Sequence, residues 1–418
     1  MAQKIKILII GNGFGGVYAL KNLHKIFHNG SEASHIELSL VGEKNYFLFT
    51  PLLHEVATGG INPQNIIEPI RKVLGCCLKN FYLGKAELIN LVNHTVKIGN
   101  MLLAYDFLIL APGAQTNFYD IPEAEKYSFP LKSIDDAIKI KNHCIMIMEH
   151  ASHIIDIEER KKILRFVVVG GGPTGVEFAA ELQELIKENF SCHYSSEVIK
   201  DASVILIQKG LELVPQFGEK IRKKSLEVLR KKGIKVLLKT KVKEVGPSHV
   251  LLDDDTSIFT KTIIWVAGTK PINIKFNEMV IKSSNGKLVV NEYLQLKNHK
   301  KVFAIGDVAT FMGANSDTPL LALAQVAEKE AIAVAKNIQL IINGIMPKQF
   351  SYHHNGSLIS LGQWMAIGEI YNFTFWGRTT WWLWRTVYLS KLISFRKKIK
   401  VAIDWTINIF SSRDISQI

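Results

Sequence analysis

The chain has 418 residues, more than one ordinary domain holds, so we expect two or three domains. Hydrophobic residues make up 47% and charged residues 21%, which excludes a disordered chain and allows a well-buried core. The formal net charge of +13 is typical of proteins that contact nucleic acid, an anionic membrane surface or anionic ligands, and the positions of the charges must decide among these.

Targeting and redox signals are few. The apolar run Ile7–Ile10 is too short for a signal-peptide core, and glycines follow it. No stretch reaches about 18 uncharged apolar residues, so we expect no transmembrane helix and a chain that stays on the side of the membrane where it is made. The cysteines form no C-x-x-C pair, which indicates reduced thiols and no zinc ribbon; they are Cys76, Cys77, Cys144 and Cys192.

The first pattern that indicates chemistry lies at the N-terminus. Ile5–Ile10 reads as a buried parallel strand, Gly11–Gly16 follows at once, and Val17–Phe27 reads as a helix. In such a turn the first glycine permits the sharp bend, the second lets the backbone approach a pyrophosphate, and the third lets the helix pack on the strand. The helix N-terminus then favours the phosphates. We therefore predict a dinucleotide site with contacts from Gly11, Gly13, Phe14, Gly15 and Gly16.

The strand Ile36–Val41 ends at Gly42-Glu43. An acid at this place binds the adenosine ribose hydroxyls in dinucleotide sites, so Glu43 is a candidate, with a solvated loop charge as the alternative. Lys97–Leu103 and Phe107–Leu110 read as further strands, and the second runs into the candidate contacts Ala111 and Gly113.

The glycine pattern recurs in the middle of the chain. Arg165–Gly170 reads as a strand and Val176–Ile186 as a helix, with the glycine turn between them. The candidate contacts in this turn are Gly170, Gly172, Pro173, Thr174 and Gly175. Two such units in one chain predict two nucleotides, a bound flavin and a diffusing nicotinamide.

The strand that partners the second unit, Val204–Ile207, ends in Gln208-Lys209. An acid there favours NADH by repelling the 2′-phosphate of NADPH. Gln208 removes that repulsion and Lys209 attracts phosphate, so we predict that NADPH is accepted better than an acid would permit. The alternative is that Gln208 bonds the ribose of NADH while Lys209 is solvated.

Two later strands also end in candidate contacts. Thr262–Val266 runs into Ala267-Gly268, where the chain crosses between domains. Val302–Ile305 ends in Gly306-Asp307, and an aspartate at such a strand end commonly bonds the ribityl or phosphate chain of a flavin. The run Asp253–Asp255 lacks the spacing of a calcium loop and reads as a hairpin turn.

Several segments in a fixed order make the chain resemble the type II NADH:quinone oxidoreductases, the non-pumping or alternative NADH dehydrogenases. They are Gly11–Gly16, Tyr46–His54, Val56–Gly59, Gly170–Glu177, Trp265–Gly268, Ile305–Asp307 and Leu323–Ala327. The resemblance implies an α/β fold of two Rossmann-type dinucleotide-binding domains, as in glutathione reductase, and a C-terminal amphipathic membrane-binding region. We expect residues 1–115 and 271–345 to bind FAD, residues 116–270 to bind NAD(P)H, and residues 346–418 to contact the membrane.

The resemblance also implies roles for individual residues. FAD is expected, non-covalently bound, at the first glycine turn, Thr50 and Asp307, and NAD(P)H at the second turn. Glu177 is expected near the nicotinamide and flavin, although a glutamate at a helix start is also ordinary dipole chemistry. Gln325 is expected on the quinone side. Many members have a second glutamine one helical turn later, where this chain has Lys329, which either stabilises charge on a quinone oxygen or is solvated.

The C-terminal region carries most of the tryptophans among lysines and arginines: Trp376, Trp381, Trp382, Trp384 and Trp405. Such a mixture suits a headgroup boundary, with the rings in the acyl region and the cations on anionic phosphates, so contact with a lipid bilayer surface is predicted. The alternative is a packed helix pair with basic outer faces. No nucleic-acid partner is expected, and no metal site, because His353 and His354 are adjacent in an extended segment and point apart.

Together these features predict an enzyme that passes electrons from NADH, or NADPH, through FAD to a membrane quinone (ubiquinone or menaquinone) without pumping protons. The candidate residues that tune this chemistry are Glu177, Gln325 and Lys329. We expect a peripheral protein on the cytoplasmic face of a bacterial inner membrane, and a homodimer is a further expectation. The alternatives are a sulfide:quinone oxidoreductase, which needs redox cysteines against the flavin, and a non-enzymatic flavoprotein that binds NAD(P)H.

Overall fold

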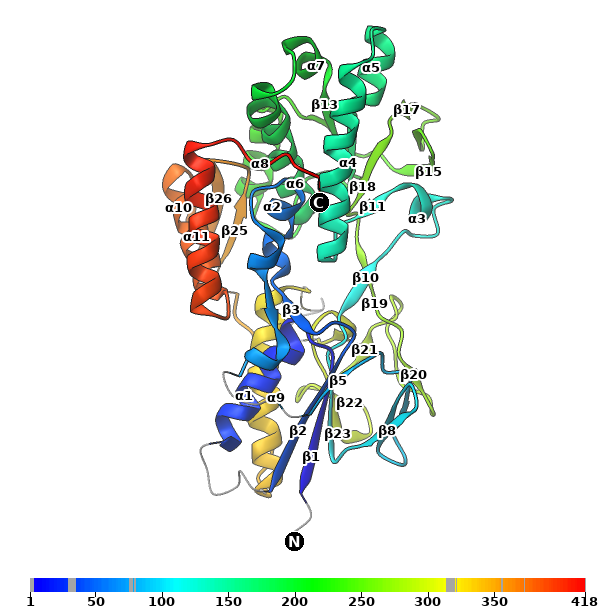
Figure 1. The fold of residues 1–418 in the computed structure, drawn as a ribbon. Helices are drawn as coiled ribbons and strands as arrows, with labels where there is room; N and C mark the ends of the chain where they lie inside the picture. Colours follow the sequence, from blue (N-terminus) through cyan, green and yellow to red (C-terminus); the bar gives the residue numbers. More distant parts are fainter. Residues whose placement is uncertain are drawn as a thin grey trace. The chain divides into compact units, whose positions relative to one another are not determined.

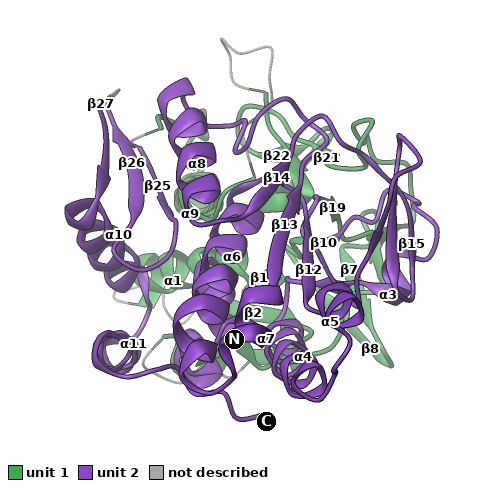
Figure 2. Cartoon of the chain, turned by 90° about the horizontal axis from the view of Figure 1, so that it is seen from above, with its two compact units in different colours: residues 1–48, 67–115, 270–354 green, residues 49–66, 116–269, 355–418 purple. Residues whose placement is uncertain are grey.

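The computed structural model describes residues 4–28, 35–74, 78, 80–312, 320, 322–354, 356–371 and 373–417. Cys76 and Cys77 lie outside these residues. The chain divides into two compact units, coloured separately in Figure 2. Unit 1 contains residues 1–48, 67–115 and 270–354, and unit 2 contains residues 49–66, 116–269 and 355–418. Residues 49–66 and 355–418 therefore cluster with the central segment that carries the second glycine turn.

Unit 1 is built on a six-stranded sheet in which β1 (Ile5–Ile10) lies at the centre. The order is β22 (Gln295–Leu296), β23 (His299–Ala304), β9 (Phe107–Leu110), β1, β2 (Ile36–Gly42) and β5 (Asn80–Leu83), and all neighbours are parallel except β22. Ile7, Leu8 and Ile9 are fully buried, as expected for a parallel strand that is covered on both faces. Helices α1 (Phe14–His28) and α9 (Ala324–Ile342) pack side by side in this unit (Figure 1).

The remaining elements of unit 1 are small. A four-stranded sheet contains β20 (Lys275–Phe276), β6 (Leu88–Asn90), β7 (Thr95–Ile98) and β8 (Met101–Ala104), and short pairs join β3 (Tyr46–Leu48) to β4 (Ile67–Pro69) and β21 (Leu288–Val289) to β24 (Ala309–Thr310). The single strand predicted at Lys97–Leu103 is wrong, because Gly99 adopts a φ of +54° and turns the chain into the β7–β8 hairpin.

Unit 2 contains a five-stranded parallel sheet, in the order β11 (Phe129–Pro130), β18 (Thr262–Trp265), β12 (Arg165–Val169), β13 (Ser203–Ile207) and β14 (Lys235–Leu237). Its helices are α2 (Leu53–Ala57), α3 (Ala124–Tyr127), α4 (Ile134–Ser152), α5 (Ile157–Ile163), α6 (Pro173–Glu184), α7 (Ser196–Asp201) and α8 (Glu219–Lys231). β15 (Val242–Gly246), β16 (His249–Leu252) and β17 (Ser257–Phe259) form an antiparallel sheet, and the predicted turn at Asp253–Asp255 joins its last two strands.

Residues 357–410 add a second antiparallel sheet and two helices to unit 2: β25 (Ser357–Ser360), β26 (Ala366–Ile370), β27 (Phe373–Gly377), α10 (Arg378–Lys391) and α11 (Phe395–Phe410). α10 packs on β26 and β27, and α8 packs on β26. The short helix α2, from the first of the stretches that make up unit 2, packs against α4 and α6. Unit 2 is thus assembled from three separate stretches of chain. β10 (Ala114–Thr116) and β19 (Thr269–Pro271) lie where the chain passes from one unit to the other.

Candidate functional site

The first glycine turn lies in unit 1 between β1 and α1, where the sequence predicts it. Gly11 has a φ of +104°, and a Cβ there would meet the Ala111 carbonyl oxygen at 2.0 Å. A Cβ on Gly16 would meet the Gly11 oxygen at 1.7 Å, so the helix can start this close to the strand only with glycine. Gly13 differs, because nothing lies within 4 Å of a Cβ built on it. The backbone there is open to a ligand, which is the feature a pyrophosphate needs.

Other predicted contacts of unit 1 lie at the carboxyl ends of neighbouring strands, where open α/β sheets bind ligands. Ala111 follows β9 and is buried, Gly113 has a φ of +83° with open space beside it, and Gly306 and Asp307 follow β23. Glu43 follows β2 and is exposed to solvent. The predicted contact Thr50 belongs to unit 2, where it is the exposed first residue of a 3₁₀ turn, Thr50–Leu52.

The second glycine turn, in unit 2, repeats this geometry. Gly170 has a φ of +119°, and a Cβ on it would meet the Ala267 Cα at 2.6 Å. A Cβ on Gly175 would meet the Gly170 oxygen at 1.8 Å, whereas nothing lies near Gly172. Gly172 is the N-cap of α6, and Pro173 occupies the first helical turn, where its missing N–H costs nothing. Two turns with the same pattern of closed and open positions indicate two nucleotide sites.

Gln208, at the end of β13, is held by the protein itself. Its Oε1 accepts a hydrogen bond from the Gly171 N–H at 3.0 Å, and its Nε2 donates to the Glu212 oxygen at 3.2 Å. Lys209 beside it is exposed. The amide therefore supports the glycine turn and carries no charge toward the place where a ribose would bind. Across the sheet, Ala267 and Gly268 follow β18 and lie against Tyr119, whose hydroxyl donates to the Ala267 oxygen at 3.4 Å.

The helix α9 carries Gln325 near its start and Lys329 one turn later. The Gln325 amide lies 3.4 Å from His354 Nδ1, and Lys329 is exposed. Sequence reasoning did not single out Glu330, which follows Lys329 directly. Glu330 is buried, its Oε2 accepts from the Gly306 N–H at 2.6 Å, and burial raises its pKa to about 7. Its position four residues after Val326 and three after Ala327, on the apolar face, was the available signal.

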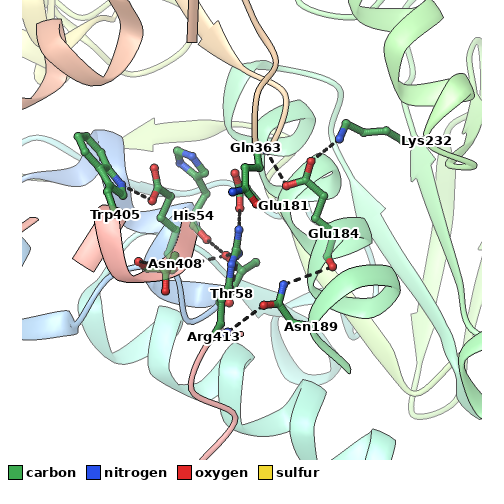
Figure 3. A network of polar contacts seen from close by, with 12 residues as sticks. His54, Thr58, Glu181, Glu184, Asn189, Lys232, Gln363, Trp405, Asn408 and Arg413 are labelled. Carbon is green, nitrogen blue, oxygen red and sulfur yellow. Dashed lines mark hydrogen bonds and ion pairs between the residues drawn. The ribbon is translucent and has the colours of Figure 1, made fainter. Parts of the chain in front are cut away.

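Glu177 lies in a buried network of unit 2 (Figure 3 shows neighbouring members). It is on the first turns of α6 and is only 7% exposed. Its Oε1 accepts from the Ser360 N–H at 3.2 Å, and its Oε2 lies 4.0 Å from His54 Nδ1. Burial, opposed by the Ser360 N–H, raises the pKa of Glu177 to about 8, and burial lowers the pKa of His54 to about 4. At neutral pH Glu177 thus holds a proton and His54 is uncharged.

The C-terminal tryptophans do two different things, which corrects the expectation that they face lipid together. Trp381, Trp384 and Trp405 are buried in unit 2, whereas Trp376 and Trp382 are half exposed. Trp405 Nε1 donates to Glu55 Oε2 at 2.6 Å, and the Arg385 guanidinium lies 3.6 Å from the centre of the Trp381 ring. The indole N–H of Trp405 thus has a polar partner, and the Arg385 cation lies over the faces of Trp381 and Trp405, so these rings are placed in the core of unit 2.

Comparisons with known proteins agree with this geometry. Residues 5–331 match the model of the pyridine nucleotide-disulphide oxidoreductase family, and residues 354–414 match an NDH2 C-terminal domain. A probable NADH dehydrogenase of Dictyostelium discoideum is 30% identical over 98% of this chain and 91% of its own length. The type II NADH:quinone oxidoreductase Ndh of Mycobacterium tuberculosis is 28% identical over 98% of this chain and 89% of its own length. The chain belongs to the type II NADH dehydrogenase family.

The fold also matches that of a solved structure. The structure of NDH2 from Plasmodium falciparum in complex with NADH superposes with a TM-score of 0.90, at 23% identity, over 99% of this chain and all of that one. Members of the family use FAD. The residues present fit this cofactor, because Gly13 and Gly113 follow strands of unit 1 and nothing lies within 4 Å of a Cβ built on either. The α/β fold and the family that the sequence predicts are confirmed.

Proposed function

We propose that this protein is an FAD-dependent NAD(P)H:quinone oxidoreductase. The observation that carries the proposal is the pair of glycine turns with the same geometry, one in each unit, in a chain that matches type II NADH dehydrogenases along nearly its whole length. In unit 1 the turn Gly11–Gly16, Ala111, Gly113, Gly306 and Asp307 would hold FAD, and in unit 2 the turn Gly170–Gly175 would hold the pyrophosphate of NADH. Bound FAD supplies the chemistry, accepting a hydride from NADH and passing two electrons to quinone.

The chain's own residues bind and orient the nucleotides, and some of them hold protons. The net reaction NADH + H⁺ + quinone → NAD⁺ + quinol takes one proton from solution in each turnover. Glu177 is protonated at neutral pH, so it is a group that can release and regain that proton. Glu330 fixes the Gly306 N–H and so holds the loop that follows β23. That Gln325 and Lys329 act on the quinone side stays a proposal. Lys329 is exposed, so the alternative that it is a solvated surface lysine also stays.

A membrane surface is proposed for one face of α11 (Figure 1). Its exposed apolar side chains follow one another at helical spacing: Phe395, Ile399, Ile403, Ile407 and Phe410. We call this row the apolar stripe. The opposite face buries Val401 and Trp405, so the helix is packed on one side and apolar on the other. No helix in the described part of the chain is long and apolar enough to cross a membrane.

We propose that the apolar stripe lies in the boundary between headgroups and acyl chains, with neighbouring cations such as Arg396 and Lys400 on anionic phosphates. Location on the cytoplasmic face of a bacterial inner membrane, the homodimer and the domain boundaries stay predictions. Flotation with liposomes of neutral and of anionic lipid tests the lipid contact, and light scattering gives the oligomeric mass.

The experiment that tests the function is steady-state oxidation of NADH and of NADPH by purified FAD-loaded protein, each with a soluble ubiquinone and a soluble menaquinone analogue. Rapid quinone-dependent turnover supports the proposal. Bleaching of the flavin absorbance by NADH without recovery on addition of either quinone would refute it and favour a binding protein. Turnover with sulfide in place of NADH would favour the sulfide:quinone alternative, for which the structure describes only a buried Cys144 and an exposed Cys192.

A further inference from the structure

Four glutamates of unit 2 lie in one buried network: Glu55 on α2, and Glu177, Glu181 and Glu184 on α6. The three on α6 are spaced four and three residues apart, so they lie on one face of the helix. α2 packs against this helix. Buried carboxylates this close cannot all be ionised, because each negative charge raises the pKa of the others. The question is therefore which glutamate keeps the proton.

One cation of the network comes from residues 411–417, which we call the strap. Arg413 Nη2 donates to Glu181 Oε2 at 2.5 Å, and Nη1 donates to Thr58 Oγ1 at 2.9 Å (Figure 3). The Arg413 N–H donates to Asn189 Oδ1 at 2.8 Å. The Arg413 side chain is 10% exposed. The strap thus fixes the guanidinium against α6 and against the end of α2 at the same time.

Two of the other carboxyl groups have partners of their own. Glu184 pairs with Lys232 and accepts from the Gln363 N–H at 2.7 Å. Glu55 accepts from the Trp405 indole at 2.6 Å. Both keep a raised pKa, about 7, chiefly because they are buried. Glu181 is the exception, since Arg413 holds its pKa below the ordinary value in spite of burial.

Glu177 has a different environment. The titratable groups that face it are His54 and Glu55 from α2, Glu181 from its own helix and Tyr388 from α10. Burial is the main reason that the pKa of Glu177 is raised, and the negative charges of Glu55 and Glu181 raise it further, while burial keeps His54 neutral. The hydrogen bond that Glu177 accepts from the Ser360 N–H favours the ionised form.

We propose that Arg413 is a positioning residue, which keeps Glu181 ionised and thereby keeps a proton of the network on Glu177. The proposal rests on the function proposed above, in which Glu177 releases and regains the proton of each turnover. Without Arg413, Glu181 is a buried carboxylate that has lost its cation, so it takes up a proton. The repulsion that helps to protonate Glu177 then disappears, and the pKa of Glu177 falls.

The test uses Arg413→Gln and Glu181→Gln in the full-length FAD-loaded protein, and measures the pH dependence of quinone reduction separately from that of flavin bleaching by NADH. Glu181→Gln removes the negative charge one helical turn from Glu177 directly, and Arg413→Gln removes it by letting Glu181 take up a proton, so the loss of quinone reduction at high pH should move down by about one pH unit. Arg413→Lys, which keeps the cation, should restore the profile. Arg230→Gln, which removes an exposed arginine of the same unit, should leave it unchanged.

The carboxyl C=O band in infrared difference spectra, followed against pH, gives a second readout that needs no turnover. It should show Glu177 titrating at lower pH in both variants, with Glu177→Gln assigning the band. An unchanged titration in Glu181→Gln, with kcat lowered or not, would overturn the proposal and leave Arg413 a purely structural role. If wild-type protein fails to reduce quinone, the proposed function fails, and the infrared titration still decides the inference. If Arg413→Gln does not fold, Arg413→Met, which removes the charge but keeps an unbranched side chain, replaces it, and Glu181→Gln still tests the effect of Glu181 on Glu177.

Discussion

Replacing Glu177 by glutamine should change how the stability of unit 2 depends on pH. In the folded chain the pKa of Glu177 is raised from 4.5 to about 8. Between these values the folded state holds a proton that the unfolded state has released, so wild-type stability falls as pH rises. At about 1.4 kcal/mol per pH unit, the free energy of unfolding loses about 3 to 4 kcal/mol between pH 5 and pH 8 through this group. Glu177→Gln removes that loss and can still accept from the Ser360 N–H.

The assay is denaturant unfolding followed by tryptophan fluorescence. All seven tryptophans lie in residues that belong to unit 2, so the signal reports that unit. The variant should gain stability over wild type steadily from pH 5 to pH 8. Glu125→Gln, at an exposed position of the same unit, serves as the control and should run parallel to wild type. Parallel curves for Glu177→Gln and wild type would show that Glu177 is already ionised at neutral pH, and the reasoning about its burial would be refuted.

Three further predictions concern the nucleotide sites and the membrane surface. Gly16→Ala should destabilise unit 1 by several kcal/mol, because its Cβ would lie 1.7 Å from a backbone oxygen, whereas Gly13→Ala should melt like wild type but lose FAD on gel filtration. Gln208→Glu, which keeps the acceptor for the Gly171 N–H, should lower kcat/KM for NADPH relative to NADH by about tenfold, the effect of roughly 1.4 kcal/mol of charge repulsion; an unchanged ratio would contradict the assignment. Ile403→Asp should weaken flotation with anionic liposomes by tenfold or more, while Ile281→Asp, on an apolar residue of unit 1 that is about as exposed, should not.

Local patterns in the sequence predicted the elements that depend on neighbouring residues. The strand–glycine–helix order at Ile5–Phe27 corresponds to β1 and α1, and the second occurrence corresponds to β12 and α6. Such units can be predicted from sequence because each glycine is required by a turn or close contact within the same strand–turn–helix unit. The hairpin at Gly99 was missed because the apolar residues on both sides of it read as one strand.

The buried network could not be predicted, because its members come from stretches of chain that are far apart. Glu55, Glu181 and Arg413 meet only after folding, and each looks like an ordinary surface charge in its own segment. The tryptophans were misread for a similar reason. Ring and cation side by side in the sequence are typical of a membrane boundary, but Trp381 and Arg385 instead stack on each other inside the unit. The apolar stripe on α11 has no tryptophan in it.

Because unit 2 takes its parts from three stretches of chain, the order of synthesis matters to it. Residues 49–66 leave the ribosome early, the central sheet follows, and the strap comes last. Until Arg413 is in place, Glu181 lacks its ion-pair partner, and the guanidinium that bridges Glu181 on α6 and Thr58 at the end of α2 is missing. A nascent chain that already contains the whole nucleotide-binding sheet therefore still exposes an unfinished, acidic face. The contacts that complete this unit join residues 232 and 355 positions apart in the sequence, and contacts of such long range are slow to form.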